Sequence, residues 1–209
     1  MATRKNNLKR ARDDDNIRNQ SKLSNEMGEE EQASISKYWL MKSEPNSRYV
    51  NGVDMKFSFD DLINSENKAT CWDGVRNYEA RKHIKCMKIN EKAFFYHSNC
   101  KSPGIVGIVS ICREAYVDHT QFDSTNAHYD AKSTKNDPKW WMVDVKFERK
   151  LKRFISLEEL KAIHLTHKSL GKGELINLSL FTRSRLSIQP INEIEWNFII
   201  SLENNQITN

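Results

Sequence analysis

The pattern of hydrophobic and polar positions divides the chain into a polar N-terminal segment and a remainder with the periodicity of a folded domain. All aromatic residues lie after position 36, and residues 1–36 contain few aliphatic side chains. A segment with so little apolar surface cannot offset its ordering entropy by burial, so we expect it to be disordered. The pattern therefore predicts a charged tail over residues 1–36 and one domain over residues 37–209.

Runs rich in β-branched and aromatic residues predict five strands in this domain. The clearest run is 140–149, where polar and apolar side chains alternate as they do in a half-buried strand. Residues 98–103 have turn chemistry, so the runs on either side of them are expected to pair. Gly104 and Gly107 lie inside a strand pattern, which indicates close backbone approach or a bulge. The predicted strands are 38–42, 92–97, 104–112, 140–149 and 186–189.

Helices are predicted between and after these strands. Capping signatures place helix starts just after Ser58 and just after Ser156, each with an acidic residue three positions later. Helix-like spacing covers residues 76–88, and Pro190 predicts the start of a terminal helix that runs to about Leu202. Strands joined by short helices, without regular βαβ alternation, favour the α+β class. A small, partly closed barrel decorated with helices would leave few bare strand edges.

The net charge of +5 belongs entirely to the predicted domain, because the tail carries as many acidic as basic residues. Residues 1–12 contain basic side chains and no acid, which is typical of a nuclear localisation signal. A solvated charged chain end is the other interpretation. The basic residues concerned are Arg4, Lys5, Lys9, Arg10 and Arg12.

Composition also disfavours several classes of protein. No run of about 18 or more apolar residues exists, so we expect no membrane-spanning helix. The N-terminus lacks the apolar stretch of a signal peptide. Four cysteines in 209 residues are too sparse for a disulfide scaffold, so we expect reduced thiols in a nuclear or cytosolic protein.

The segment 71–81 is the richest candidate site, because it leads into a predicted helix whose first N–H groups are free to bind a ligand. An aromatic ring beside such donors suits a planar ligand such as a nucleobase. The alternative is structural, with the tryptophan in the core, the aspartate as the helix cap and the arginines on the surface. In the binding interpretation Trp72 stacks on the base, Asp73 or Asn77 reads its edge, and Arg76 or Arg81 meets phosphate.

Two strand ends add polar candidates. Lys42, Ser43, Glu44 and Pro45 end the first strand, and buried polar groups at such a position often line a pocket. The segment 97–99, which begins with a histidine, ends another strand. The alternatives are a simple turn in the first case and a structural histidine in the second.

Metal and catalytic patterns are weak. Zinc sites usually contain a Cys-x-x-Cys knuckle, which is missing, so we expect neither a metal nor another cofactor. The motifs of zinc deaminases and of the nucleophile elbow are also missing, and we expect no enzymatic activity. A chance cysteine–histidine dyad of His97 with Cys71 or Cys100 stays open. The pairs with ligand-like spacing are His83 with Cys86, His97 with Cys100, and His164 with His167.

Several motifs in the same order resemble the EVE domain, over residues 37–203. The resemblance implies a PUA-like fold, a mixed β pseudobarrel with flanking helices that is related to the YTH domain. It also implies a nuclear, non-enzymatic reader that binds modified cytosine in DNA, bearing a methyl, hydroxymethyl or formyl group, by holding a flipped base in an aromatic and polar pocket. The motifs are 38–45, 72–81, 93–99, 139–140 and 184–190.

Residue by residue, the resemblance implies the following site. The phosphate-binding set is Arg76, Arg81, Lys101 and Arg185. Trp141 is not carried over, because the family is not reliably aromatic there. The pocket set is Lys42, Ser43, Glu44, Pro45, Trp72, Asp73, Gly74, Val75, Arg76, Asn77, Tyr96, His97, Ser98, Asn99, Trp140, Leu186 and Ser187.

Other functions stay open beside this one. YTH relatives read methylated adenine in RNA, so an RNA-binding module is an alternative, and a preference for the 2′-hydroxyl would identify it. An enzyme that acts on a flipped base and a protein-interaction module are the others. We expect a monomer whose partner is DNA, without a role for a membrane or a metal.

Overall fold

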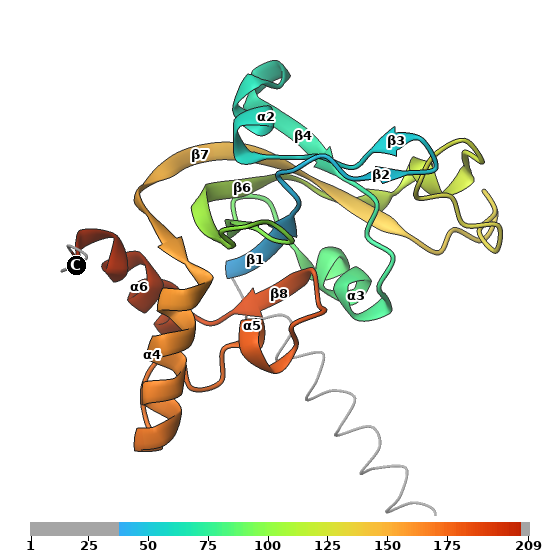
Figure 1. The fold of residues 1–209 in the computed structure, drawn as a ribbon. Helices are drawn as coiled ribbons and strands as arrows, with labels where there is room; N and C mark the ends of the chain where they lie inside the picture. The colour runs from blue at the N-terminus through green and yellow to red at the C-terminus, as the bar shows by residue number, and fades with distance from the viewer. Residues whose placement is uncertain (1–37, 206–209) are drawn as a thin grey trace, which may run out of the picture. The chain divides into compact units, whose positions relative to one another are not determined.

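The structure, a computed structural model, describes residues 38–205, and the predicted tail with its basic cluster lies outside them. A six-stranded sheet with the order β4-β7-β6-β5-β1-β8 forms the framework (Figure 1). Neighbouring strands are antiparallel except β1 and β5, which are parallel. The strands are β1 Tyr38–Ser43, β4 Ala69–Trp72, β5 Lys92–His97, β6 Gly104–Val117, β7 Trp141–Ser156 and β8 Ile188–Ile191, and a separate hairpin joins β2 Tyr49–Val50 to β3 Val53–Asp54.

Two of the helices begin at the capping residues expected from the sequence. Ser58 and Asp61 form a reciprocal capping box at the start of α2, and the Ser156 hydroxyl accepts a hydrogen bond from the Glu159 amide at the start of α4. The helices are α2 Phe59–Asn64, α3 Tyr78–Cys86, α4 Leu157–Leu170, α5 Ser179–Thr182 and α6 Glu193–Ser201, with short 3₁₀ turns at Glu66–Lys68, His119–Phe122 and Leu202–Asn204.

The sheet separates two hydrophobic cores, and β1 contributes to both. Trp39 and Met41 pack in the core that α2 and α3 cover, whereas Leu40, between them, packs in the core that α4, α5 and α6 cover. The same alternation runs along β5, where Phe94 and Phe95 point into different cores. Both strands are therefore buried on two faces, which explains their continuous apolar sequences.

The two glycines of β6 permit close packing, as the sequence indicated. A Cβ on Gly107 would overlap the ring of Phe59, and a Cβ on Gly104 would overlap the backbone of Ile155. The register with β7 shifts beside Gly107, so this part of the strand is also irregular.

The α+β class is confirmed, as is the EVE-type mixed sheet with flanking helices. In the part of the chain that the structure describes, β4 and β8 are the edges of an open sheet, so the barrel does not close. Pro190 was expected to start the last helix, but it lies inside β8, and Asn192 caps α6 instead. Proline is tolerated there because β8 is an edge strand.

The sequence analysis missed β4 and the β2–β3 hairpin, which are short. Within residues 38–205, no helix has the length and apolar character needed to cross a membrane.

Candidate functional site

A pocket of about 470 Å³ opens where β1 ends. Its walls come from five parts of the chain: the end of β1, the hairpin with the segment after it, the end of β4 with the loop that follows, the long connection between β6 and β7, and the residue just before β8. The predicted residues among its lining are Lys42, Ser43, Glu44, Trp72, Asp73, Gly74, Val75, Arg76 and Ser187.

The parallel pairing of β1 with β5 sets the floor of this region, because parallel strands end at the same edge of a sheet. Ser43 pairs with His97 in register, and the Ser98 amide donates a hydrogen bond of 2.8 Å to the Ser43 carbonyl. The Ser43 hydroxyl donates to the carbonyl of Phe57. Ser43 is thus buried, and its hydroxyl proton is already used in a hydrogen bond. The hydroxyl oxygen can still accept a hydrogen bond from a ligand.

Trp72 belongs to both the core and the pocket. Its side chain is 6% exposed and makes edge-on contacts with Phe57 and Phe95, at centroid distances of 5.9 and 5.3 Å. It also lines the pocket. The structural and the binding interpretations of Trp72 are therefore compatible, and the core contacts hold the ring in place.

Asp73 places a carboxyl group in the pocket beside Trp72. Desolvation by burial, and then the nearby charge of Asp118, raise the pKa of Asp73 above its usual range. Within residues 38–205, the Cys71 thiol, 4.0 Å away, is the only hydrogen-bond donor to this carboxyl group. Asp73 is a polar group left largely available for a ligand.

Gly74 and His128 meet at the pocket wall. Gly74 has a φ of +72°, and a Cβ there would overlap the imidazole of His128. The Gly74 amide donates a 3.0 Å hydrogen bond to Asp118. Glycine is required both for the backbone conformation and for the close approach of the histidine.

Arg76 uses its guanidinium inside the protein. It donates to Asp118 at 2.7 Å, to Thr120 at 2.9 Å and to the carbonyl of His128 at 2.8 Å. These contacts attach the β6–β7 connection to the loop after β4. Arg76 therefore positions the pocket wall, and its predicted contact with phosphate stays a prediction.

Lys42 contributes a cation whose charge is pH-sensitive near neutrality. Its ammonium group donates to the Ser184 carbonyl at 2.9 Å, and its amide donates to Ser187. Desolvation by burial lowers the pKa of Lys42 to about 8. The amine is held between the end of β1 and the segment before β8.

Several predicted pocket residues have structural partners and do not line the pocket. The Nε2 atom of His97 accepts the backbone amide of Phe59 at 3.1 Å, and desolvation by burial lowers the pKa of His97, which favours this neutral role. Asn77 caps α3 by accepting the amides of Glu79 and Ala80.

Trp140 is the last residue of the β6–β7 connection, and its indole donates a hydrogen bond to Asp130 within the same connection at 2.7 Å. Pro45, Ser98 and Asn99 lie near the end of β1 and β5 but outside the lining. Tyr96 and Leu186 are buried in the cores.

The remaining predicted phosphate contacts differ in exposure. Lys101 and Arg185 are exposed. Arg81 is half-buried, donates to the Lys139 carbonyl at 2.8 Å, and lies over the ring of Tyr78 at 4.7 Å.

The sequence analysis missed two walls of the pocket. One is the hairpin, although Asn51-Gly52 is a strong hairpin signal that could have revealed it. The other is the β6–β7 connection, whose distant residues carry no local sign of their approach. The missed lining residues of these two walls are Arg48, Val53, Asp54, Met55, Lys56, Phe57, Asn126, Ala127 and His128, and Thr70 of β4 was missed as well.

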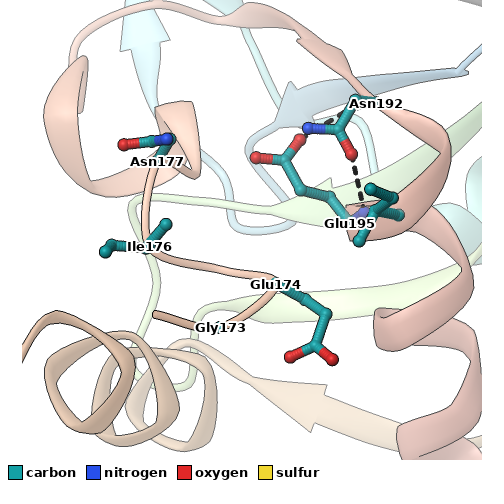
Figure 2. Close-up of a pocket in the computed structure, with 7 residues that line it drawn as sticks. Gly173, Glu174, Ile176, Asn177, Asn192 and Glu195 are labelled. Carbon is teal, nitrogen blue, oxygen red and sulfur yellow. Dashed lines mark hydrogen bonds between the residues drawn. The ribbon is translucent and has the colours of Figure 1, made fainter. Parts of the chain in front are cut away.

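A second, smaller hollow of about 290 Å³ lies between the segment after α4 and the start of α6 (Figure 2). Its main polar groups already satisfy one another, because Asn192 and Glu195 form the capping box of α6. No cluster of three or more His, Cys, Asp or Glu side chains in residues 38–205 could hold a metal ion. The larger pocket is therefore the candidate site.

Comparison with known proteins agrees with this architecture. The family model described as "EVE domain" matches residues 37–202. The chain belongs to the EVE domain family. Thymocyte nuclear protein 1 of Mus musculus is 58% identical to it over 170 residues, covering 81% of this chain and 75% of the mouse protein.

Solved structures resemble it as well. A crystal structure of human THYN1 protein in complex with 5-methylcytosine-containing DNA has a TM-score of 0.80 and 57% identity, and covers 81% of this chain and 98% of the human chain. A structure of a hypothetical protein from Leishmania major has a TM-score of 0.68 and 40% identity, and covers 81% of this chain and 95% of that one.

Proposed function

We propose that this EVE domain protein is a nuclear, non-enzymatic reader that binds modified cytosine in DNA as a monomer, with one flipped base held in the pocket at the end of β1. The observation that carries the proposal is the match, over 81% of the chain, to the human THYN1 complex with 5-methylcytosine-containing DNA. The pocket volume supports it, because small-ligand sites usually measure about 300–1,000 Å³.

The pocket chemistry also fits a cytosine. Cytosine presents an N4 amino group as donor, whereas thymine presents an O4 acceptor at the same position. An ionised Asp73 accepts a hydrogen bond from the amino group and repels the thymine oxygen. We infer that Asp73 reads the base edge while Trp72 packs against the base.

The energetics require contacts outside the pocket. Stacking on an aromatic ring contributes about 1–3 kcal/mol, and flipping a base costs a few kcal/mol, so the two nearly cancel. Phosphate contacts must supply the remaining affinity, and binding should weaken steeply with salt. The cations available for this role are Lys42, Arg81, Lys101 and Arg185.

Discrimination of the modification should be modest. Burying one methyl group contributes about 0.8 kcal/mol, which is a few-fold in affinity. A hydroxymethyl or formyl group can add a hydrogen bond, for example to the Ser43 oxygen, worth about 0.5–1.5 kcal/mol. We expect selectivity of about tenfold to a hundredfold over unmodified DNA.

The test is fluorescence anisotropy at one fixed salt concentration. The probes are matched duplexes with cytosine, methylcytosine, hydroxymethylcytosine, formylcytosine or thymine at one position, and a methyladenine RNA. Asp73→Ala should remove the preference for cytosine over thymine, whereas Asp60→Ala, which removes an exposed acid that pairs with Lys150, should not. Trp72→Phe, which keeps an aromatic ring in the core, should weaken binding without unfolding the domain.

Three results would redirect the assignment. Equal affinity for all duplexes would contradict the proposal that the protein reads modified cytosine. Tighter binding of the methyladenine RNA would favour the RNA module. Conversion of a modified base during incubation would reveal an enzyme. Nuclear location is tested separately, by imaging a fluorescent fusion before and after replacement of the basic residues in positions 1–12.

A further inference from the structure

The β2–β3 hairpin leaves two of its apolar side chains, those of Tyr49 and Val53, in solvent. Its turn residues, Asn51 and Gly52, have φ values of +51° and +81°, as a two-residue hairpin turn requires. The side chain of Tyr49 is 70% exposed and that of Val53 is 39% exposed. Within residues 38–205, Tyr49 stacks on no other aromatic ring. Packing inside the domain therefore does not explain a tyrosine at this position.

The base of the hairpin is nevertheless firmly held. The Asp54 carboxylate accepts the amides of Arg48 and Lys56, each at 3.1 Å, and the hydroxyl of Ser47 at 2.7 Å. The Met55 amide donates to the Arg48 carbonyl at 2.9 Å. A two-stranded hairpin is marginally stable alone, so these bonds keep it in a fixed direction.

The hairpin is also continuous with the pocket. Arg48, Val53 and Asp54 line the pocket, and so do the residues that follow to Phe57. In Figure 1 the hairpin extends from the sheet beside the β6–β7 connection, which supplies another pocket wall. Tyr49 is therefore carried next to the place where a bound base would enter.

A flipped base leaves a gap in the duplex, and the two neighbouring base pairs lose stacking across it. Proteins that distort DNA often insert an apolar side chain between base steps to offset that loss. We propose that the β2–β3 hairpin is a wedge that enters the duplex, with the ring of Tyr49 in the space that the flipped cytosine leaves. The inference rests on the proposed function and assigns the hairpin a role outside the base pocket.

The test compares a duplex with a single strand, because only the duplex has a gap to fill. The protein is titrated with a fluorescent duplex that carries one methylcytosine and with the same strand alone. Tyr49→Ala should weaken duplex binding about tenfold, the loss expected for one stacked ring. It should change single-strand binding less than about twofold, because no stack is broken there.

The control variant is Leu170→Ala, which removes another exposed apolar side chain at the end of α4. It should leave both affinities unchanged, and thermal unfolding should show that both variants fold. Equal losses for Tyr49→Ala on duplex and single strand, or no loss on either, would overturn the wedge. Failure of the proposed function is distinct, because wild type would then bind methylated and plain duplexes alike.

Discussion

The guanidinium of Arg76 lies 2.7 Å from the buried carboxylate of Asp118, and this ion pair joins segments that are 42 positions apart. Asp118 also accepts the amides of Gly74 and Thr120. Through these bonds one side chain connects the loop after β4 to the β6–β7 connection. The pocket wall formed by His128 depends on that link.

Removal of Asp118 should therefore destabilise the domain. Asp118→Ala leaves the partly buried Arg76 charge without its partner, and breaking such a pair costs about 3 kcal/mol. Urea denaturation should show this decrease in the free energy of unfolding. Asp123→Ala, which removes an exposed acid from the same connection, should change it by less than about 1 kcal/mol.

Gly74 should tolerate no side chain. Gly74→Ala combines a positive φ with an overlap on the His128 ring, so we expect a loss of about 1–3 kcal/mol in stability together with weaker DNA binding. The matched control is Gly171→Ala at the end of α4, where φ is +65° and nothing lies within 4 Å of the added Cβ. The control should show only the backbone penalty, about 1 kcal/mol, with DNA affinity intact. Similar losses in both variants would mean that contact with His128 is unimportant.

Asp73 should make base discrimination depend on pH. Burial raises the pKa of its carboxyl group, so the group gains its proton at a higher pH than an ordinary aspartate. The neutral acid can donate to a thymine oxygen, so the preference for cytosine over thymine should shrink as pH falls, at a higher pH than an ordinary aspartate would require. Anisotropy titrations from neutral into acid pH measure the change for wild type and for Asp73→Asn, and the same pH profile in both would contradict the role of Asp73.

The same shift has a stability consequence of determined sign. The folded state holds the Asp73 proton more tightly than the unfolded state, because the pKa of this carboxyl group is raised by folding. The stabilisation that results is full below the unfolded-state pKa and is lost as pH rises through the folded-state pKa. At pH 7 the charged group therefore opposes folding. Asp73→Asn should raise the melting temperature at pH 7 and lose that advantage in acid, whereas Asp60→Asn should not.

Lys42 should impose a second pH dependence at the alkaline end. Its pKa of about 8 means that the amine loses its charge as pH rises from 7 to 9, and attraction to phosphate should fall with it. Lys42→Met should bind more weakly at pH 7 and show a flatter profile. Lys92 lies at the start of β5, whereas Lys42 pairs with Tyr96 near the end of that strand. Lys92→Met should therefore keep the wild-type pH profile. An unchanged profile in Lys42→Met would exclude Lys42 from DNA contact.

The sequence predicted the main helices and strands well, because helix caps and strand alternation are set by residues that are close in sequence. Ser58 with Asp61 and Ser156 with Glu159 mark the starts of α2 and α4, and the alternation in 140–149 marks β7. Short elements were missed for the same reason. The four residues of β4 acquire strand structure by pairing with β7, which the local sequence does not record.

The site was predictable only in part. The residues from Trp72 to Arg76 adjoin one another in sequence and reach the pocket together. His128 and the hairpin arrive through tertiary contacts such as the one between Arg76 and the His128 carbonyl. His97 and Asn77 show the converse, because polar residues next to a site can satisfy backbone amides instead of a ligand.

The position of β1 between β5 and β8 has a consequence for the newly made chain. This strand is synthesised first among the described elements, yet its two neighbours, β5 and β8, emerge only after residues 92–97 and 188–191 have been translated. Before β5 is made, the apolar residues of β1 have no strand to pair with, and until β8 is made one of its edges stays unpaired. Contacts between residues so distant in sequence form slowly. The order of translation thus makes the end of β1 that lines the pocket one of the last parts of the domain to mature, and a ribosome stalled before Ile188 would hold a chain with that strand half paired.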